Sequence, residues 1–127
     1  MIDALFSQSN YVATKKMMDA TAMRHQAIAS NIAHIETPNY KRIDLAPDFS
    51  RELRSAVSTR DASRISSIQP MLMEDSSAKA ANRDGNTVQL ESELMNLNQN
   101  TLAHALETQI VTGALLKLRL AITGRPA

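Results

Sequence analysis

The chain has 127 residues, of which 43% are hydrophobic and 3% aromatic, and its 14 basic and 13 acidic residues give a formal net charge of +1. This length fits one small unit, and the scarcity of aromatic side chains favours helix-on-helix packing over a β-sheet core. The balanced charge excludes electrostatic steering toward nucleic acid, an acidic substrate or a membrane surface, and the absence of cysteine excludes disulfides and thiolate chemistry.

The first predicted element is a helix over about residues 4–36. Residues spaced alternately three and four apart form a seam of the coiled-coil type, and its C-terminal half, with Ile28, Ile32 and Ile35, is the more apolar. Residues 1–6 contain neither a basic segment nor a long apolar one, so we expect no cleavable secretion signal. If the chain leaves the cytoplasm, we expect it to use another route.

This helix is predicted to end in a specific turn within residues 29–41, which read Ala-Ser-Asn-Ile-Ala-His-Ile-Glu-Thr-Pro-Asn-Tyr-Lys. Asn31 is a weak helix former, and Pro38 disfavours a helical conformation at Thr37. Asn39 follows, and asparagine tolerates the left-handed backbone conformation better than other non-glycine residues. The sequence therefore specifies where the chain turns.

Residues 37–86 lose the helical periodicity and become rich in Ser, Arg, Asp and Ala. Two apolar clusters interrupt this composition, one around Phe49 and Leu53 and the other over residues 65–73. We interpret the segment as an irregular linker of low foldability, with one short strand or hairpin near 65–73 as its only expected regular structure.

The second long helix is predicted over residues 87–123, opened by a capping box of Asn86 and Gln89. It carries two apolar stripes, and one neighbouring helix can cover only one of them, so we expect other subunits to cover the rest. The residues predicted to pack between helices or subunits are Ile28, Ile35, Leu90, Leu94, Leu97, Leu102, Leu106, Ile110, Val111, Leu115, Leu118 and Ile122.

These features together predict an all-α fold: one unit of residues 1–127 with two long terminal helices in coiled-coil-like packing and an irregular middle. The sequence shows no catalytic motif, and His25, His34 and His104 lack the spacing of a metal-binding pair. We therefore expect no enzymatic activity, no metal, no cofactor, no small-molecule substrate and no nucleic-acid partner.

The turn after the first helix resembles the Ser-Asn-Ile-Ala…Thr-Pro-Gly-Tyr signature of the axial proteins of the bacterial flagellum, which form its rod and hook. The matching residues are Ser30, Asn31, Ile32, Ala33, Thr37, Pro38 and Tyr40, while Asn39 stands where the family usually has glycine. The middle segment is too short for the inserted β domains of hook and distal rod proteins, so the resemblance narrows to the small proximal rod proteins. Residues 40–45 and 84–94 are similar to that group as well.

The resemblance implies a structural subunit that leaves the cytoplasm through the flagellar type III export apparatus and polymerises in the periplasm as part of the drive shaft. Its implied partners are further copies of itself, other rod subunits, and adapter proteins between the rod and the membrane ring. The alternative function is a non-polymerising helical export chaperone or adaptor, whose long C-terminal helix would bind one client.

Overall fold

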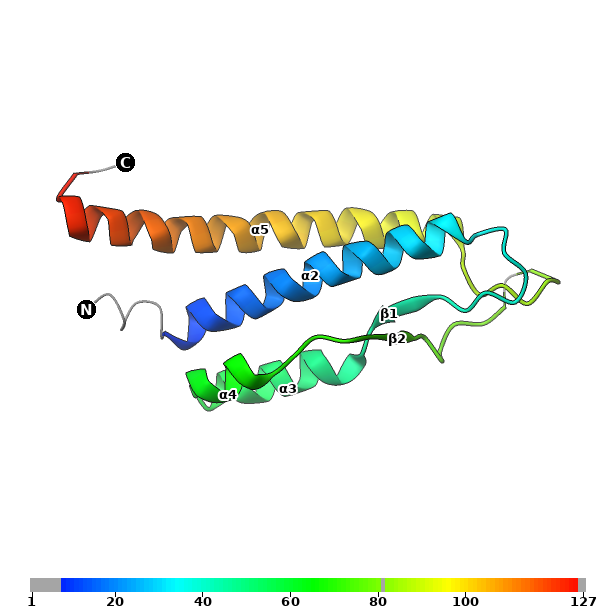
Figure 1. Ribbon diagram of the computed structural model, residues 1–127, viewed down its shortest axis with the longest axis horizontal. Coiled ribbons are helices and arrows are strands. Elements are labelled where there is room, and N and C mark those ends of the chain that lie inside the picture. Colours follow the sequence, from blue (N-terminus) through cyan, green and yellow to red (C-terminus); the bar gives the residue numbers. More distant parts are fainter. Residues whose placement is uncertain (1–7, 81, 126–127) are drawn as a thin grey trace.

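The computed structural model describes residues 8–80 and 82–125 (Figure 1). In chain order the elements are α2 (Ser9–Ala33), β1 (Ile43–Leu45), α3 (Pro47–Ser58), α4 (Ala62–Ser67), β2 (Leu72–Glu74) and α5 (Leu90–Thr123). Helices α2 and α5 run antiparallel, with α5 along one side of α2 and the smaller elements along the other side (Figure 1). α2 is therefore the central layer.

The prediction of two long terminal helices is confirmed. Each helix is about three residues shorter than predicted at the end that adjoins the middle segment. α2 ends at Ala33, and the backbone N–H of Thr37 donates to the His34 carbonyl at 3.0 Å, so the chain makes tight turns before Pro38. α5 begins at Leu90 and ends at Thr123, where Gly124 takes the left-handed conformation typical of a helix end. Residues 4–7 of the first predicted helix lie outside the described residues.

The prediction of a strictly all-α fold was wrong, because β1 and β2 form a small antiparallel sheet. Ile43 pairs with Glu74, and Leu45 pairs with Leu72. The predicted cluster at 65–73 does supply most of one strand, but its partner comes from residues 43–45 rather than from an adjacent hairpin. Such three-residue strands are too short for alternation to identify from sequence.

The prediction that residues 37–86 form an irregular linker of low foldability was also wrong, because this segment contains α3 and α4. Pro47 lies at the start of α3, where proline loses no hydrogen bond, and Phe49, Leu53 and Ala56 share one buried face at helical spacing. α4 is capped by the Asp61 carboxylate, which accepts from the Arg64 backbone N–H at 3.1 Å.

The hydrophobic core lies between α2, α3 and α4. It consists of Ala13, Ala20, Phe49, Leu53, Ala56, Ile65 and Ile68. The alanines of α2 let the short helices approach closely, so the core is small and contains one aromatic ring. Consequently most of the large apolar side chains of α5 take no part in it.

The side chains of α5 that are buried at its contact with α2 are polar, whereas Leu97 and Val111 on the same face are half-buried. On α5 the side chains that face α2 and are buried are Glu93, Asn100 and Glu107. The Asn100 side-chain amide donates to the Thr21 carbonyl at 2.8 Å, and the Thr21 hydroxyl donates to Glu107 at 2.9 Å. Among the helices that the structure describes, none is long and apolar enough to cross a membrane.

Candidate functional site

Asn31 is the centre of the motif turn. It lies near the end of α2 and is completely buried. Its side-chain oxygen accepts from the Ile43 backbone N–H at 2.9 Å, and its amide nitrogen donates to the Ile43 carbonyl at 2.9 Å and to the Glu93 carboxylate at 3.3 Å. One carboxamide therefore joins α2 to β1 and to the first turn of α5.

Tyr40 closes the turn over the end of α2. Its ring stacks on His34 with a centroid separation of 4.5 Å and an interplanar angle of 3°. Its hydroxyl lies 3.1 Å from the Ser30 hydroxyl and donates to the Asn31 side-chain oxygen at 3.4 Å. Three motif residues thus meet at one point, which explains why the motif needs a tyrosine after the proline.

Asn39 has the left-handed conformation predicted for it, with φ of 60°. Its backbone N–H donates to the Asp84 carbonyl at 2.9 Å, and its side chain covers Gly85. A Cβ on Gly85 would lie 2.5 Å from the Asn39 side-chain oxygen, and Gly85 itself has φ of +80°. Position 85 therefore requires glycine for both space and conformation.

Asn86 ties the turn to the segment before α5. Its amide nitrogen donates to the carbonyls of His34, Ile35 and Thr37 at 2.9, 3.0 and 2.9 Å, and its oxygen accepts from the Val88 N–H at 2.7 Å. The predicted capping box was wrong, because α5 starts later, with Gln89 at its N-cap and no side-chain cap. Asn86 satisfies carbonyls beyond the end of α2 instead of N–H groups at the start of α5.

Arg42 holds a cluster of charges beside the turn. It pairs with Glu93 at 2.7 Å, with Asp44 at 3.2 Å and with Asp75, and Arg24 also pairs with Asp44 at 3.0 Å. Burial opposes the charge on Arg42, but the hydrogen bonds and negative charges of Glu93, Asp75 and Asp44 together outweigh it and raise the pKa of the guanidinium. The cluster links α2, the sheet and α5 at one end of the molecule.

A hydrogen bond from the Ser77 hydroxyl lowers the pKa of Asp75, and the contact with Arg42 lowers it further. Asp75 is therefore held as a carboxylate. Because Asp75 lies directly after β2, its charge fastens the end of the sheet to Arg42.

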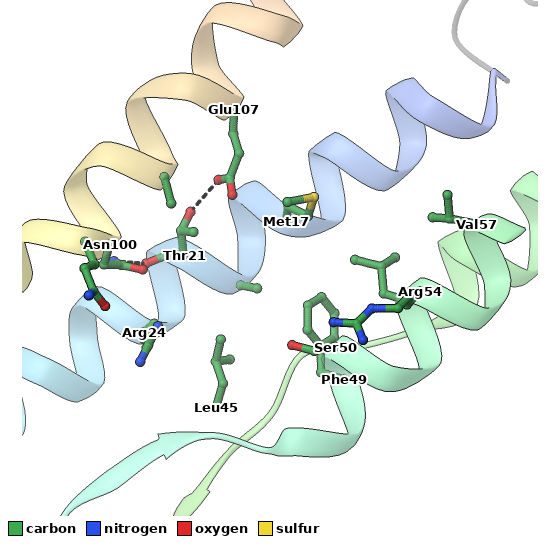
Figure 2. Close-up of a pocket in the computed structure, with 14 residues that line it drawn as sticks. Met17, Thr21, Arg24, Leu45, Phe49, Ser50, Arg54, Val57, Asn100 and Glu107 are labelled. Atoms are coloured by element: carbon green, nitrogen blue, oxygen red, sulfur yellow. Dashed lines mark hydrogen bonds between the residues drawn. The ribbon is translucent and has the colours of Figure 1, made fainter. Parts of the chain in front are cut away.

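A groove of about 550 Å³ opens between α2, α3 and α5 (Figure 2). Apolar side chains including Met17, Phe49 and Val57 line it, and the charged side chains of Arg54 and Glu107 also line it (Figure 2). Burial raises the pKa of Glu107, against the hydrogen bond from Thr21 and the nearby His104. The part of the chain that the structure describes contains no group of three or more metal-ligating side chains.

The structure brings the predicted motif residues together around Asn31. Ser30, Ile32 and Tyr40 are half-buried, whereas Ala33, Thr37 and Pro38 are exposed. Sequence reasoning assigned no role to Arg42 or Glu93. The signal available in the sequence was the pair of acidic residues Glu91 and Glu93 near the start of the second helix, and nothing in the local sequence identifies which of them is buried in an ion pair.

The residues predicted to pack between helices or subunits have different environments. Ile28 is buried, and Ile35, Leu97, Val111 and Leu118 are half-buried. The others are 45–72% exposed in the single chain: Leu90, Leu94, Leu102, Leu106, Ile110, Leu115 and Ile122. Their packing between subunits remains a prediction, since one chain shows no neighbour.

Two long antiparallel helices, the Asn-Ile-Ala…Thr-Pro turn built around the buried Asn31, and the exposed apolar side chains of α5 are the features expected of a subunit of the flagellar axial class. The rod protein FlgB of Borrelia hermsii is 32% identical over 113 residues, which cover 75% of this chain and 82% of that protein. The chain belongs to the FlgB family of flagellar basal body rod proteins. The resemblance seen in the sequence is therefore confirmed.

Two further proteins named flagellar basal body rod protein FlgB are similar to the chain. Those of Borreliella burgdorferi and Aquifex aeolicus are 27% and 29% identical, each over 113 residues, and the chain covers 82% and 90% of their lengths. No protein-family model matches the chain. All three relatives are rod components, so the chain is a structural component of the flagellar basal body, and the chaperone or adaptor alternative has no support.

Proposed function

We propose that this chain is a subunit of the proximal rod, which polymerises with further copies and with other axial proteins into the periplasmic drive shaft of the flagellum. It would act as a single folded unit and reach the periplasm through the flagellar export apparatus. Its other partners would be adapter proteins between the rod and the membrane ring. No enzymatic step belongs to this function.

The observation that carries the proposal is the apolar surface of α5. The side chains of Leu102 and Leu106 are 72% and 61% exposed, and Met95 is 62% exposed. The side chains of α5 that α2 buries are instead Glu93, Asn100 and Glu107. A surface of this kind is costly for a free monomer and is ordinarily covered by another protein, and the relatives are rod proteins of the flagellar basal body.

The polar contact between α2 and α5 fits a subunit that must remain unassembled before export. Thr21, Asn100 and Glu107 hold the two helices together through hydrogen bonds that tolerate water, whereas the apolar stripes gain free energy only when neighbours cover them. Most of the apolar burial would therefore take place during assembly in the rod.

The test is quantitative mass spectrometry of purified basal bodies, combined with a surface variant. We expect the chain to be retained at a fixed ratio to the ring proteins after soluble and hook proteins are removed. Leu102→Asp should abolish swimming and retention while leaving the far-UV circular dichroism of the purified chain unchanged, because that side chain is exposed in the monomer. Ala29→Asp, at an exposed position of α2, is the matched control.

Absence of the wild-type chain from basal bodies would overturn the proposed function. Normal swimming of the Leu102→Asp variant would show instead that this part of α5 is not covered in the rod.

A further inference from the structure

The three buried side chains of α5 are all polar, and they are spaced seven residues apart. Glu93, Asn100 and Glu107 are 0%, 3% and 4% exposed, whereas every leucine, isoleucine and valine of this helix is half-buried or exposed. A seven-residue spacing keeps side chains on the one side of a helix that packs along a neighbouring helix. Polar groups therefore occupy the line of closest contact with α2, although α5 contains many apolar residues.

Each of the three polar groups meets a complementary group. Asn100 donates to the Thr21 carbonyl at 2.8 Å, and the Glu107 carboxylate accepts from the Thr21 hydroxyl at 2.9 Å (Figure 2). The Glu93 carboxylate pairs with the largely buried guanidinium of Arg42 at 2.7 Å. Along α5 the order is thus carboxylate, amide, carboxylate, and each position has a different partner group.

This order opposes a slip of α5 along α2 by seven residues. In either direction a glutamate would take the place of Asn100 and turn an ionised carboxylate toward the Thr21 carbonyl, and neither group has a hydrogen to donate. Glu93 would also move about 10 Å from Arg42, at about 1.5 Å per residue, and Arg42 would lose its most buried counter-charge. Leaving a buried charge without its partner is strongly unfavourable.

A rotation of α5 would exchange the polar contacts for apolar ones. The side chains of Leu102 and Leu106 are 72% and 61% exposed, and turning them toward α2 would bury large apolar groups in place of polar ones. Burial raises the pKa of Glu107, so its ionised form is unfavourable where it lies. The observed pairing is therefore selected by the polar groups and not by apolar burial.

We propose that Glu93, Asn100 and Glu107 fix the face and the register in which α5 pairs with α2, and so determine which apolar side chains of α5 remain on the outside. Buried polar residues act in this way in coiled coils, where they select one arrangement at a cost in stability. The inference goes beyond the proposed rod function and does not depend on it, because it concerns two helices of one chain and is tested on purified protein.

The test replaces the two polar side chains whose partner is Thr21. An Asn100→Leu and Glu107→Leu double variant leaves no charge unpaired at this site. The Thr21 hydroxyl retains the Met18 carbonyl at 3.0 Å and the His104 ring nitrogen at 2.9 Å as partners. The variant therefore removes the proposed selection without creating a buried ion.

Spin labels report the pairing of the two helices. They are attached at Ala29→Cys in α2 and Ala105→Cys in α5, both exposed positions, and the chain contains no cysteine of its own. Dilution with unlabelled chain restricts double electron–electron resonance to distances within one molecule. We expect one narrow distance distribution when Asn100 and Glu107 are present. With both replaced by leucine, we expect a second population several ångströms away, since one seven-residue step moves a helix about 10 Å, and an equal or higher urea midpoint.

Two control variants separate polarity from added volume. Thr101→Leu with Thr108→Leu adds the same side chains, also seven residues apart, at exposed positions of α5. Glu107→Gln keeps an oxygen that can accept from the Thr21 hydroxyl. Both controls should retain the single narrow distribution.

Three results would overturn the inference. One unchanged distance in the Asn100→Leu and Glu107→Leu variant would mean that other contacts set the register. Loss of its helical circular dichroism would mean that the polar groups supply stability and do not select between arrangements. A second population in the Thr101→Leu and Thr108→Leu control would mean that any added leucine shifts the pairing. None of these results bears on whether the chain is retained in basal bodies.

Discussion

Replacing Asn86 by alanine should destabilise the whole turn region, because its buried side chain holds carbonyls of three residues that follow α2 closely. An amide nitrogen has two hydrogens, so the bonds to His34, Ile35 and Thr37 include one shared hydrogen, and a further bond comes from the Val88 N–H. Three full hydrogen bonds at about 0.5–1.5 kcal/mol each predict a loss of about 1.5–4.5 kcal/mol.

The assay is urea unfolding of the purified chain followed by far-UV circular dichroism, with Asn82→Ala as the control at an exposed position four residues earlier. We expect the unfolding midpoint of the control to match the wild type. A single hydrogen bond contributes up to about 1.5 kcal/mol to the free energy of unfolding. A loss below about 1 kcal/mol for Asn86→Ala would therefore refute the role assigned to this side chain.

Asn86→Asp adds a dependence on pH that separates hydrogen bonding from simple packing. The aspartate would keep the contact with Val88 but, when ionised, would face three carbonyl oxygens, so the pKa of that carboxyl should rise in the folded state. A raised carboxyl pKa means that the deficit relative to wild type is full at neutral pH and shrinks as pH falls through the folded pKa. A deficit that does not change with pH would contradict the geometry.

Three other substitutions test the turn region and the contact between α2 and α5. Glu93→Gln should cost about 2–4 kcal/mol in urea unfolding, because it removes the buried carboxylate that faces Arg42, and an unchanged midpoint would contradict this. Gly85→Ala should cost about 1–3 kcal/mol through backbone strain and the contact with Asn39; Asn39→Gly should recover only the contact part, and full recovery would mean that strain is negligible. Because burial raises the pKa of Glu107, the ionised form weakens the fold, so Glu107→Gln should be more stable than wild type at neutral pH and equal to it at low pH; equal melting temperatures at both pH values would refute this.

The two long helices were predictable because each contains several turns of apolar periodicity bounded by proline or glycine. The left-handed residue at position 39 was predictable for a different reason, since asparagine after Thr-Pro has few alternatives. α3 was missed although Phe49, Leu53 and Ala56 have the spacing of a helix, because the serines and arginines around them match a solvated linker equally well.

The face of α5 that contacts α2 could not be predicted from apolar periodicity. Apolar residues surround much of this helix, so periodicity indicates several possible faces, and the one that α2 contacts contains Glu93, Asn100 and Glu107. The positions of these groups depend on partners from distant parts of the chain, such as Arg42 and Thr21. Such pairings follow from the fold and cannot be obtained from the local sequence.

The carboxamide of Asn31 also protects the unassembled chain from aggregation. By bonding to both the N–H and the carbonyl of Ile43, it occupies the side of β1 that faces away from β2, where a further strand would otherwise add. An open strand edge invites pairing with other chains and leads to aggregation. A single side chain from a helix thus acts as edge protection for the sheet, and aspartate, which lacks the donor, could not replace it.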